Sequence, residues 1–289
     1  MTAESPESPF LVPFDGSFRV ADTATAPIET DKESLKTRLK AATRQLDSLQ
    51  RQLLANNSYA VLLIFQGMDA SGKDSTIRNV MGGISPTGCQ TFSFKKPTRI
   101  ELDHDFLWRT SCSLPERGRI GIFNRSQYEE VLVVRVHPEI LQNQNLPRTS
   151  VGDAFWSERL ESIREQEEHL ARNGMVILKF WLNISADEQK NRFLRRLDEP
   201  DKHWKFNADD VAERRYWASY MQAYEEALNS TSRPWAPWYA IPADSKPYMR
   251  ACVAELIVRS LSGLAMKYPK PDANDLIRFE AARKELLGG

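Results

Sequence analysis

Apolar and polar residues alternate along the chain in blocks that have the lengths of strands and helices. An uninterrupted apolar run begins at Val61 and stops at Gly67, which is typical of a parallel strand buried on both faces. Further strands are predicted at residues 91–94, 119–124, 175–183 and 238–241, and helices at 154–172 and 208–229. Strands that alternate with helices predict right-handed crossovers and an α/β fold, with a mostly parallel sheet covered by helices on both faces.

Two segments precede the first strand. Residues 1–29 are rich in Pro, Ser, Thr and Ala, and we expect an extended or partly disordered arm. Thr30 and Glu33 have the spacing of a capping box, which predicts a helix over residues 30–57. Its apolar positions recur at helical spacing, so this face is expected to be core or a subunit contact. These positions are Leu35, Leu39, Leu46, Leu49 and Leu53.

Length, charge and cysteine content exclude several classes of protein. The 289 residues contain 39 Lys plus Arg and 39 Asp plus Glu, so no overall charge attracts nucleic acid. Three widely spaced cysteines favour neither a disulfide framework nor a zinc site. Apolar stretches of about seven residues are too short to span a membrane. We expect one domain over residues 1–289, in a cytoplasmic protein without a membrane partner.

The bend after the first strand has the pattern of a phosphate-binding loop. Gly67 is followed by Gly72 and Lys73 at the predicted start of a helix. Such a bend directs backbone N–H groups and the positive end of the helix dipole toward an anion, and the lysine adds a charge. Strand, spacing, lysine and helix start agree, which favours a phosphate site over a simple glycine turn. The residues expected to surround the phosphates are Gly67, Ala70, Ser71, Gly72, Lys73, Asp74 and Ser75.

Two carboxylates in this loop indicate a metal-dependent site. Asp74 stands where a Ser or Thr commonly holds Mg²⁺, so another ligand is needed. Asp69 would repel bound phosphates unless a cation lay between them, and we expect it to be the Mg²⁺ ligand. Its alternative role is to cap the helix. Asp74 either favours the helix N-terminus electrostatically or reaches the metal through water. Mn²⁺ is the alternative ion.

The strand at 119–124 leads into a second polar motif. Asn124 stands where an acidic residue would lie in a common P-loop protein, and a neutral amide orients water or an acceptor group. Arg125 suits bidentate phosphate binding, although it could also form a surface ion pair with Glu129 one turn later. Because both motifs follow strands of a parallel sheet, they are expected to meet at one edge. Glu129 is included among the candidate nucleotide-site residues.

Cationic clusters after two other strands extend the predicted site. Arg192, Arg195 and Arg196 lie within one helical turn and are followed by a Pro-containing turn, which favours a mobile lid over about residues 187–215. The alternative is a solvated charged face. Lys95 and Lys96 end another strand and either extend the cationic track or protect the sheet edge from aggregation.

Six segments together resemble the polyphosphate kinase 2 family. They are GMDASGKDSTI, FKKPT, GIFNRSQYEEVLVVRVHPE, EQKNRFLRRL, DKHWKF and PWYAIPADSKPYMR, and they span about residues 35–265 in the family's order. The chain is most similar to the subgroup that accepts both nucleoside mono- and diphosphates. Ser71 and Gln127 depart from the usual residues of the family, and Gln127 leaves the acceptor preference open.

The resemblance implies a P-loop kinase fold with a helical lid and a reversible, Mg²⁺-dependent reaction. The reaction is phosphoryl transfer from inorganic polyphosphate to AMP or ADP, giving ADP or ATP. Asp69 and Lys73 would serve metal and phosphate, Asn124 and Arg125 would line the second motif, and Arg192 would come from the lid. The family resemblance also favours a homodimer or homotetramer.

Two other functions fit the same motifs. An ATP-dependent nucleoside monophosphate kinase would have a similar loop, lid and metal requirement. A non-catalytic P-loop module that senses nucleotides is suggested by Asp74 and by the neutral Asn124, whereas the arginine cluster favours catalysis.

Overall fold

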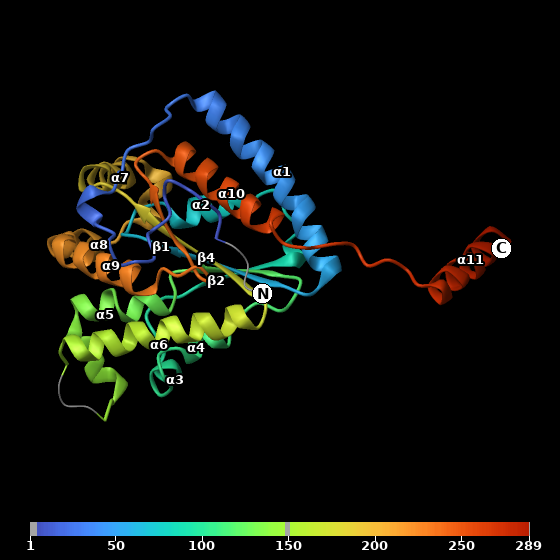
Figure 1. The fold of residues 1–289 in the computed structure, drawn as a ribbon. Coiled ribbons are helices and arrows are strands. Elements are labelled where there is room, and N and C mark those ends of the chain that lie inside the picture. The colour runs from blue at the N-terminus through green and yellow to red at the C-terminus, as the bar shows by residue number, and fades with distance from the viewer. Residues whose placement is uncertain (1–4, 148–150, 289) are drawn as a thin grey trace.

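The computed structural model describes residues 5–147 and 151–288, and its centre is a five-stranded parallel sheet (Figure 1). The strand order is β2-β3-β1-β4-β5, and each neighbouring pair is parallel. The strands are β1 (Ala60–Gln66), β2 (Cys89–Ser93), β3 (Ile120–Asn124), β4 (Met175–Asn183) and β5 (Trp238–Pro242). All seven residues of β1 are buried, as expected for the central strand of a sheet covered on both faces. The predicted α/β fold class is confirmed.

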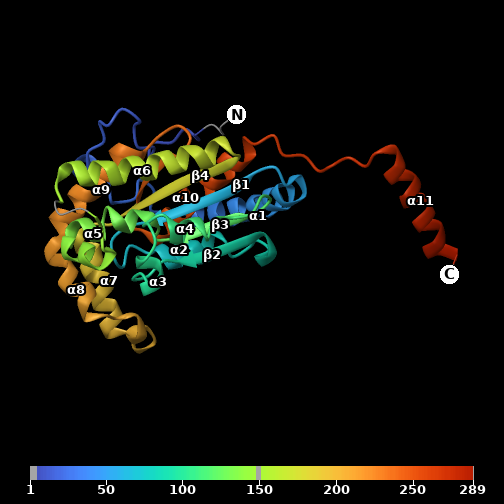
Figure 2. The same ribbon diagram turned by 90° about the horizontal axis from the view of Figure 1, so that it is seen from below.

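Helices cover both faces of the sheet (Figures 1 and 2). On one face lie α1 (Lys32–Asn56), α2 (Lys73–Val80) and α10 (Lys246–Ser262), and α6 (Asp153–Arg172) lies on the other. The remaining α-helices are α3 (Arg99–Leu102), α4 (Trp108–Ser111), α5 (Val133–Val136), α7 (Ala186–Asp198), α8 (Ala208–Glu213), α9 (Trp217–Thr231) and α11 (Ala273–Gly288). Short 3-10 helices are η1 (Val20–Asp22), η2 (Pro86–Gly88), η3 (Gln127–Glu130), η4 (Pro138–Gln144), η5 (Pro200–Lys205) and η6 (Arg214–Tyr216).

The helix predicted at 30–57 is α1, but its start is built differently. Asp31 is the N-cap, and its carboxylate accepts from the backbone N–H groups of Glu33 and Ser34 at 3.2 and 3.3 Å. The predicted capping box at Thr30 is therefore wrong, because the neighbouring carboxylate satisfies the free N–H groups instead. The leucine face of α1 packs in the core beside α10, so it is used within the chain. A homodimer or homotetramer would need another surface.

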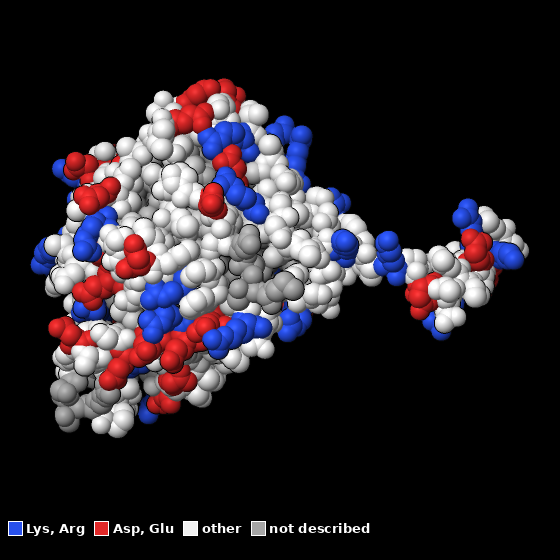
Figure 3. Space-filling view, in the orientation of Figure 1, with Lys and Arg blue, Asp and Glu red and all other residues white. Residues whose placement is uncertain are grey.

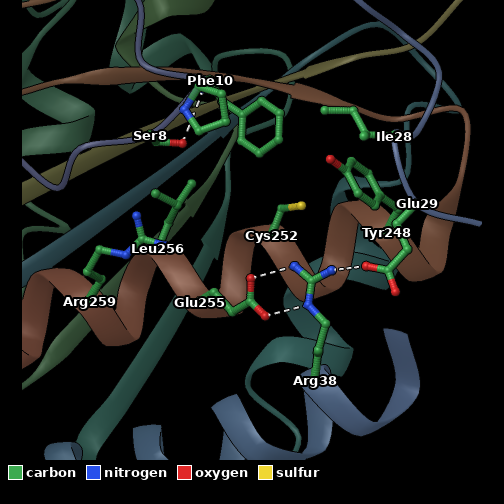
Figure 4. Close-up of a pocket in the computed structure, with 11 residues that line it drawn as sticks. Ser8, Phe10, Ile28, Glu29, Arg38, Tyr248, Cys252, Glu255, Leu256 and Arg259 are labelled. Carbon is green, nitrogen blue, oxygen red and sulfur yellow. Dashed lines mark hydrogen bonds and ion pairs between the residues drawn. The ribbon is translucent and has the colours of Figure 1, made fainter. Parts of the chain in front are cut away.

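Two half-buried ion pairs of one arginine join α1 to α10 and to the N-terminal arm (Figure 4). Arg38 donates from Nε and Nη2 to the two carboxylate oxygens of Glu255 at 2.8 and 2.7 Å. Its third nitrogen pairs with Glu29 in the arm. The fork geometry of the guanidinium suits this arrangement, and the pair shows how the fold neutralises a half-buried arginine on this face.

The described part of the arm is extended but ordered. Val12 donates to the Trp238 carbonyl at 2.9 Å and Ala240 donates to the Phe10 carbonyl at 2.8 Å, so the arm pairs with β5. Val12 is fully buried. Of the two alternatives expected for the arm, the described residues 5–29 follow the extended one over most of their length. The bridge between Leu11 and Tyr239 thus covers part of the open edge at β5.

The C-terminal half departs from prediction in one place. The helix predicted at 208–229 is divided into α8, η6 and α9, and the apolar face that packs in the core belongs to α9. After α10 the chain runs out from the body and ends in α11 (Figures 1 and 2). Within the described residues, no helix combines the length and the apolar character needed to cross a bilayer.

Candidate functional site

The predicted motifs meet in one cavity at the carboxyl edge of the sheet, with a volume of about 610 Å³. Its walls come from the loop after β1, the ends of β2 and β3, helix α7 and the start of α10. The candidate residues that line it are Asp69, Ala70, Gly72, Lys73, Asp74, Ser75, Lys95, Lys96, Asn124, Arg125, Arg192, Arg195 and Arg196. Gly67, Ser71 and Glu129 lie behind this surface and shape it through the contacts described below.

The loop has the backbone conformation of an anion cradle. Gly67 and Gly72 have φ angles of 150° and 108°, and Ala70 has a φ of 61°. A Cβ atom at Gly67 would lie 2.9 Å from the Leu182 carbonyl oxygen, so a larger residue would push the loop off β4. Ala70 is held in a left-handed conformation that is strained for a residue with a side chain, and such strain concentrates at functional sites.

Backbone N–H groups at the start of α2 are left for a ligand. The first amide of this helix with a backbone acceptor is that of Thr76, which donates to the Gly72 carbonyl at 2.9 Å. In the described residues, the N–H groups of Gly72, Lys73, Asp74 and Ser75 donate to no protein group. No side chain in the part of the chain that the structure describes caps this end of the helix. Free donors at a helix N-terminus form an anion-binding site.

Lys73 lies beneath this loop, with its ammonium group held close to the cavity. Its Nζ donates to the carbonyl of Gly67 at 2.7 Å and to that of Met68 at 3.3 Å. Burial lowers the pKa of Lys73, and the nearby Arg125 guanidinium lowers it further. A bound phosphate would relieve both effects, because an anion stabilises the charged ammonium.

Arg125 joins the two motifs through its two terminal nitrogens. Nη2 lies 2.7 Å from Asp69 Oδ1 in the loop, and Nη1 lies 3.0 Å from Glu129 Oε2. The alternative ion pair with Glu129 is thus present, and Arg125 also lines the cavity. The two carboxylates, Glu129 first, raise the pKa of Arg125. Asp69 is not the helix cap, because Gly72 occupies the N-cap position.

Asp74 and Asn124 form a second connection between the motifs. Asn124 donates from Nδ2 to Asp74 and, at 3.4 Å, to Ser93 Oγ. Its Oδ1 atom is buried and has no hydrogen-bond partner among the described residues. A buried acceptor without a donor is costly, so a water or ligand donor is expected at this atom.

The oxygen donors suit a metal that arrives with phosphates. Among the described residues, no group of three or more His, Cys, Asp or Glu side chains is placed to hold an ion. The cavity offers the carboxylates of Asp69 and Asp74. Mg²⁺ commonly binds through one or two carboxylates, with phosphate oxygens and waters completing the shell. The residues therefore fit a phosphate-bound Mg²⁺ rather than a permanently held ion.

Arg192 occupies a different position from the one predicted. The sequence suggested a lid arginine that approaches a phosphate, but this side chain is 4% exposed and all of its N–H groups are used. Nη1 donates to the carbonyls of Ala70 and Ser71 at 2.9 and 2.7 Å. Nη2 donates to the carbonyls of Ala243 and Asp244 at 2.5 and 3.2 Å, and Nε donates to Glu188. Arg192 therefore fixes the loop against the turn between β5 and α10.

The other two arginines of α7 remain at the cavity surface. Arg195 is 49% exposed and pairs with Glu188 at 2.6 Å, while Arg196 pairs with Asp210 at 3.3 Å. Seven further residues that sequence reasoning missed line the same cavity: Ser93, Phe94, Lys202, Trp204, Lys205, Asp210 and Lys246. Three of them lie in the DKHWKF segment after α7, and Lys246 begins α10 directly after β5. Lys246 could have been found from the sequence, because it follows the end of a predicted strand, where ligands bind in parallel sheets.

A second cavity of about 650 Å³ adjoins the first. The two share three cations, Lys95, Lys96 and Arg125. Gln127 and Glu129 line the second cavity, whose other walls come from residues 97–109 and 130–144. The segments FKKPT and GIFNRSQYEEVLVVRVHPE contribute to these walls, but their spacing alone did not show that they enclose a cavity.

A buried polar cluster fixes η3, which carries residues of both cavities. Lys179 on β4 donates to Tyr128 Oη at 2.9 Å and to Glu167 on α6. Tyr128 donates to the other oxygen of Glu167 at 2.8 Å. Burial lowers the pKa of Lys179 to about 8, although Glu167 opposes that shift. Because each charged group has a partner, the cluster holds the second motif without leaving a charge unpaired.

Comparison with known proteins places these features in a family context. The family model described as Polyphosphate kinase 2 matches residues 29–269. The chain is 52% identical to the ADP-polyphosphate phosphotransferase of Rhodopseudomonas palustris, over 92% of this chain and 90% of that protein. It is 44% identical to the AMP/ADP-polyphosphate phosphotransferase of Meiothermus ruber, over 89% of this chain and 94% of that one. The crystal structure of Polyphosphate Kinase 2 from Arthrobacter aurescens TC1 superposes with a TM-score of 0.87 at 37% identity, covering 98% of each chain.

The position of Arg192 predicts a large stability effect for a conservative change. Arg192→Lys replaces the planar guanidinium with a single ammonium and leaves several buried carbonyls without donors. The free energy of unfolding should therefore fall by about 2 kcal/mol. Arg195→Lys is the matched control, because Arg195 is half exposed and shares the Glu188 partner. That change should stay within about 0.5 kcal/mol. Equal effects of the two substitutions in urea unfolding would show that Arg192 does not hold the loop.

Proposed function

The chain belongs to the polyphosphate kinase 2 family, and we propose on this basis that it transfers a phosphoryl group from inorganic polyphosphate to ADP and to AMP. The names of the relatives in Rhodopseudomonas palustris and Meiothermus ruber support ADP and AMP/ADP, respectively, as acceptors. The structural observation that carries the proposal is the pair of adjoining cavities with shared cations. A polyanionic donor and a nucleotide acceptor could then bind at the same time.

The first cavity is proposed to bind the end of the polyphosphate chain. Its loop offers free backbone N–H groups, and the ammonium of Lys73 lies directly below. The overall charge of the chain is zero, and Figure 3 shows acidic and basic side chains mixed over one face. Binding of a polyanion therefore depends on this local cluster rather than on an overall field.

The second cavity is proposed to bind the nucleoside part of the acceptor. A volume of about 650 Å³ is within the range of small-molecule sites. Lys95, Lys96 and Arg125 stand where the two cavities meet, so they are placed to hold the acceptor phosphate beside the donor phosphate. Gln127 faces the second cavity, which makes it a candidate for the preference between AMP and ADP.

The proposed reaction exchanges one phosphoanhydride for another. A terminal oxygen of the AMP or ADP phosphate forms a bond to the end phosphorus of the polymer, and the bond from that phosphorus to the chain breaks. The polymer leaves one phosphate shorter, and the reaction is reversible. Lys73 and Arg125 stabilise the charge that shifts to the phosphate oxygens, and the cavity aligns the reacting groups. Neither step needs a nucleophile from the protein.

Asp69 is proposed to hold Mg²⁺, or Mn²⁺ as an alternative, together with the bound phosphates. Its carboxylate is partly exposed in the cavity and pairs with Arg125 through Oδ1. When bound, the ion would neutralise phosphate charge next to this carboxylate. Arg125 then keeps Asp69 directed at the loop in the absence of substrate.

Residues 187–215 are proposed to act as a lid over the first cavity. This range includes most of α7 and all of η5 and α8. Arg195, Arg196 and Lys202 face the cavity from it, whereas Arg192 fixes the base of α7 to the loop. Movement of the lid is therefore expected beyond Arg192.

The proposed function predicts ATP formation from ADP without any other nucleotide donor. Protein incubated with ADP, Mg²⁺ and long-chain polyphosphate should yield ATP, measured by luciferase luminescence, and Lys73→Ala should lower the rate at least about a hundredfold. Arg283→Gln, on the distant α11, is the control for lost positive charge. If ATP phosphorylates AMP but polyphosphate phosphorylates neither AMP nor ADP, the protein is an ATP-dependent kinase instead.

The metal role of Asp69 predicts a change in Mg²⁺ dependence. Asp69→Asn should raise the Mg²⁺ concentration for half-maximal rate about tenfold, because a neutral amide is a weaker ligand. Glu129→Gln is the matched control, since Glu129 pairs with the other nitrogen of the same arginine. If the two variants respond equally, Asp69 acts only by orienting Arg125. An unchanged Mg²⁺ dependence would transfer the metal role to Asp74.

A further inference from the structure

Gln189 on α7 connects the phosphate loop to a segment that is distant in sequence. Its side chain is 1% exposed, and Nε2 donates to the Asp69 carbonyl at 2.9 Å. Its Oε1 accepts from Arg214 Nη1 at 2.8 Å. Each end of the amide thus meets the kind of partner that it can bind, which fixes its orientation. Because a buried amide is costly to leave without these bonds, Gln189 holds the loop and Arg214 at a fixed separation.

The hydrogen bond from Gln189 supports the strained part of the loop. Asp69 directly precedes Ala70, whose φ is 61°. Arg192, one turn after Gln189 on α7, binds the carbonyls of Ala70 and of the residue after it. Helix α7 therefore holds three successive carbonyls of the loop. Arg192 connects them to the turn after β5, whereas Gln189 connects the Asp69 carbonyl to Arg214.

Arg214 lies at the junction between α8 and α9. It is the first residue of η6, and Glu213 before it is the last residue of α8. Nη1 of Arg214 also donates to the carbonyl of Ala186, the first residue of α7, at 3.0 Å. One nitrogen thus binds both the backbone of α7 and the side chain of Gln189. The junction and the first turn of α7 are therefore held together.

The same junction is attached to the wall of the second cavity. His137 Nε2 lies 2.9 Å from Glu213 Oε2, and Tyr220 Oη donates to that oxygen at 2.9 Å. The rings of His137 and Tyr216 meet edge to face, with their centroids 4.7 Å apart. His137 stands between α5 and η4, and residues of both elements line the second cavity. Residues 213–216 therefore support this wall as well as the loop.

We propose that Gln189 and Arg214 are positioning residues that couple the metal-binding part of the phosphate loop to the acceptor cavity. The connection runs from His137 through Glu213, Arg214 and Gln189 to Asp69. This inference rests on the proposed function, because it uses the proposed roles of Asp69 and of the second cavity. Within the described residues, Gln189 and Arg214 line neither cavity, so they act through Asp69. Partners of this kind orient the groups that bind a metal.

A cycle of two substitutions tests the connection. Gln189→Met keeps the length of the side chain and removes both hydrogen bonds, and Arg214→Met removes the donor on the other side. Each should raise the Mg²⁺ concentration for half-maximal ATP formation about fivefold and also raise the KM for ADP. Because both changes break one connection, the double variant should show about the same fivefold change. The product of two separate effects, or an unchanged Mg²⁺ dependence in either single variant, would overturn the proposal.

Two matched control variants separate positioning from general stability. Gln50 is also 1% exposed and forms two hydrogen bonds, both to the backbone of Ser85, but it lies on α1. Arg215 is exposed and donates to the Ala212 carbonyl at 3.2 Å. Gln50→Met and Arg215→Met should leave the Mg²⁺ dependence and the KM for ADP unchanged. An equal shift in Gln50→Met and Gln189→Met would overturn the proposal, because lost stability alone would then explain it.

Hydrogen–deuterium exchange tests the support of the loop without turnover or metal. In the free protein, peptides that span residues 67–75 should exchange faster in Gln189→Met and Arg214→Met than in Gln50→Met or the unmodified protein. Unchanged exchange of these peptides in both variants would overturn the proposal. If the unmodified protein makes no ATP from polyphosphate but both variants speed exchange in the loop, the connection stands and the proposed function fails.

Discussion

The hydrogen bonds of Arg192 are the constraint on which the site depends. One guanidinium joins the carbonyls of the phosphate loop to those of the turn between β5 and α10, which are distant in sequence. The loop is strained at Ala70, and the N–H groups of residues 72–75 have no acceptor among the described residues. Such a conformation persists only when the surroundings hold it, and Arg192 supplies that support from α7. Preorganised amides then need no rearrangement when phosphate charge arrives.

The cationic side chains of this neutral chain fall into two groups, those with a carboxylate partner and those without one. Arg38, Arg125 and Lys179 each have carboxylate partners and serve to fix elements relative to one another. Lys246 and Arg250 form no ion pair among the described residues, and burial and neighbouring cations lower the pKa of both, so their charged forms are costly in the unliganded protein. Binding a polyanion would reverse that cost. The same cavity edge thus combines rigid support with an excess of positive charge that only a ligand can neutralise.

Local sequence patterns predicted much of the fold, but they did not predict the detailed contacts that hold the site. Apolar runs predicted the strands, and the bounds of β4 matched the prediction, because burial on both faces leaves a continuous apolar signal. The glycine and lysine spacing located the loop for the same local reason. The role of Arg192 was missed because its acceptors are backbone carbonyls far along the chain, which no side-chain pattern reveals. Asp31 as the N-cap and the order of the arm likewise depended on contacts that spacing alone does not define.

The central claim is that the amides of the loop bind the phosphates of the polymer. Hydrogen–deuterium exchange, followed by mass spectrometry of peptides that span residues 67–75, measures this directly. Addition of long-chain polyphosphate with Mg²⁺ should slow exchange in these peptides, because the free N–H groups at the start of α2 acquire phosphate acceptors. Unchanged exchange over residues 67–75, with protection appearing on another surface at saturating polymer, would contradict the account.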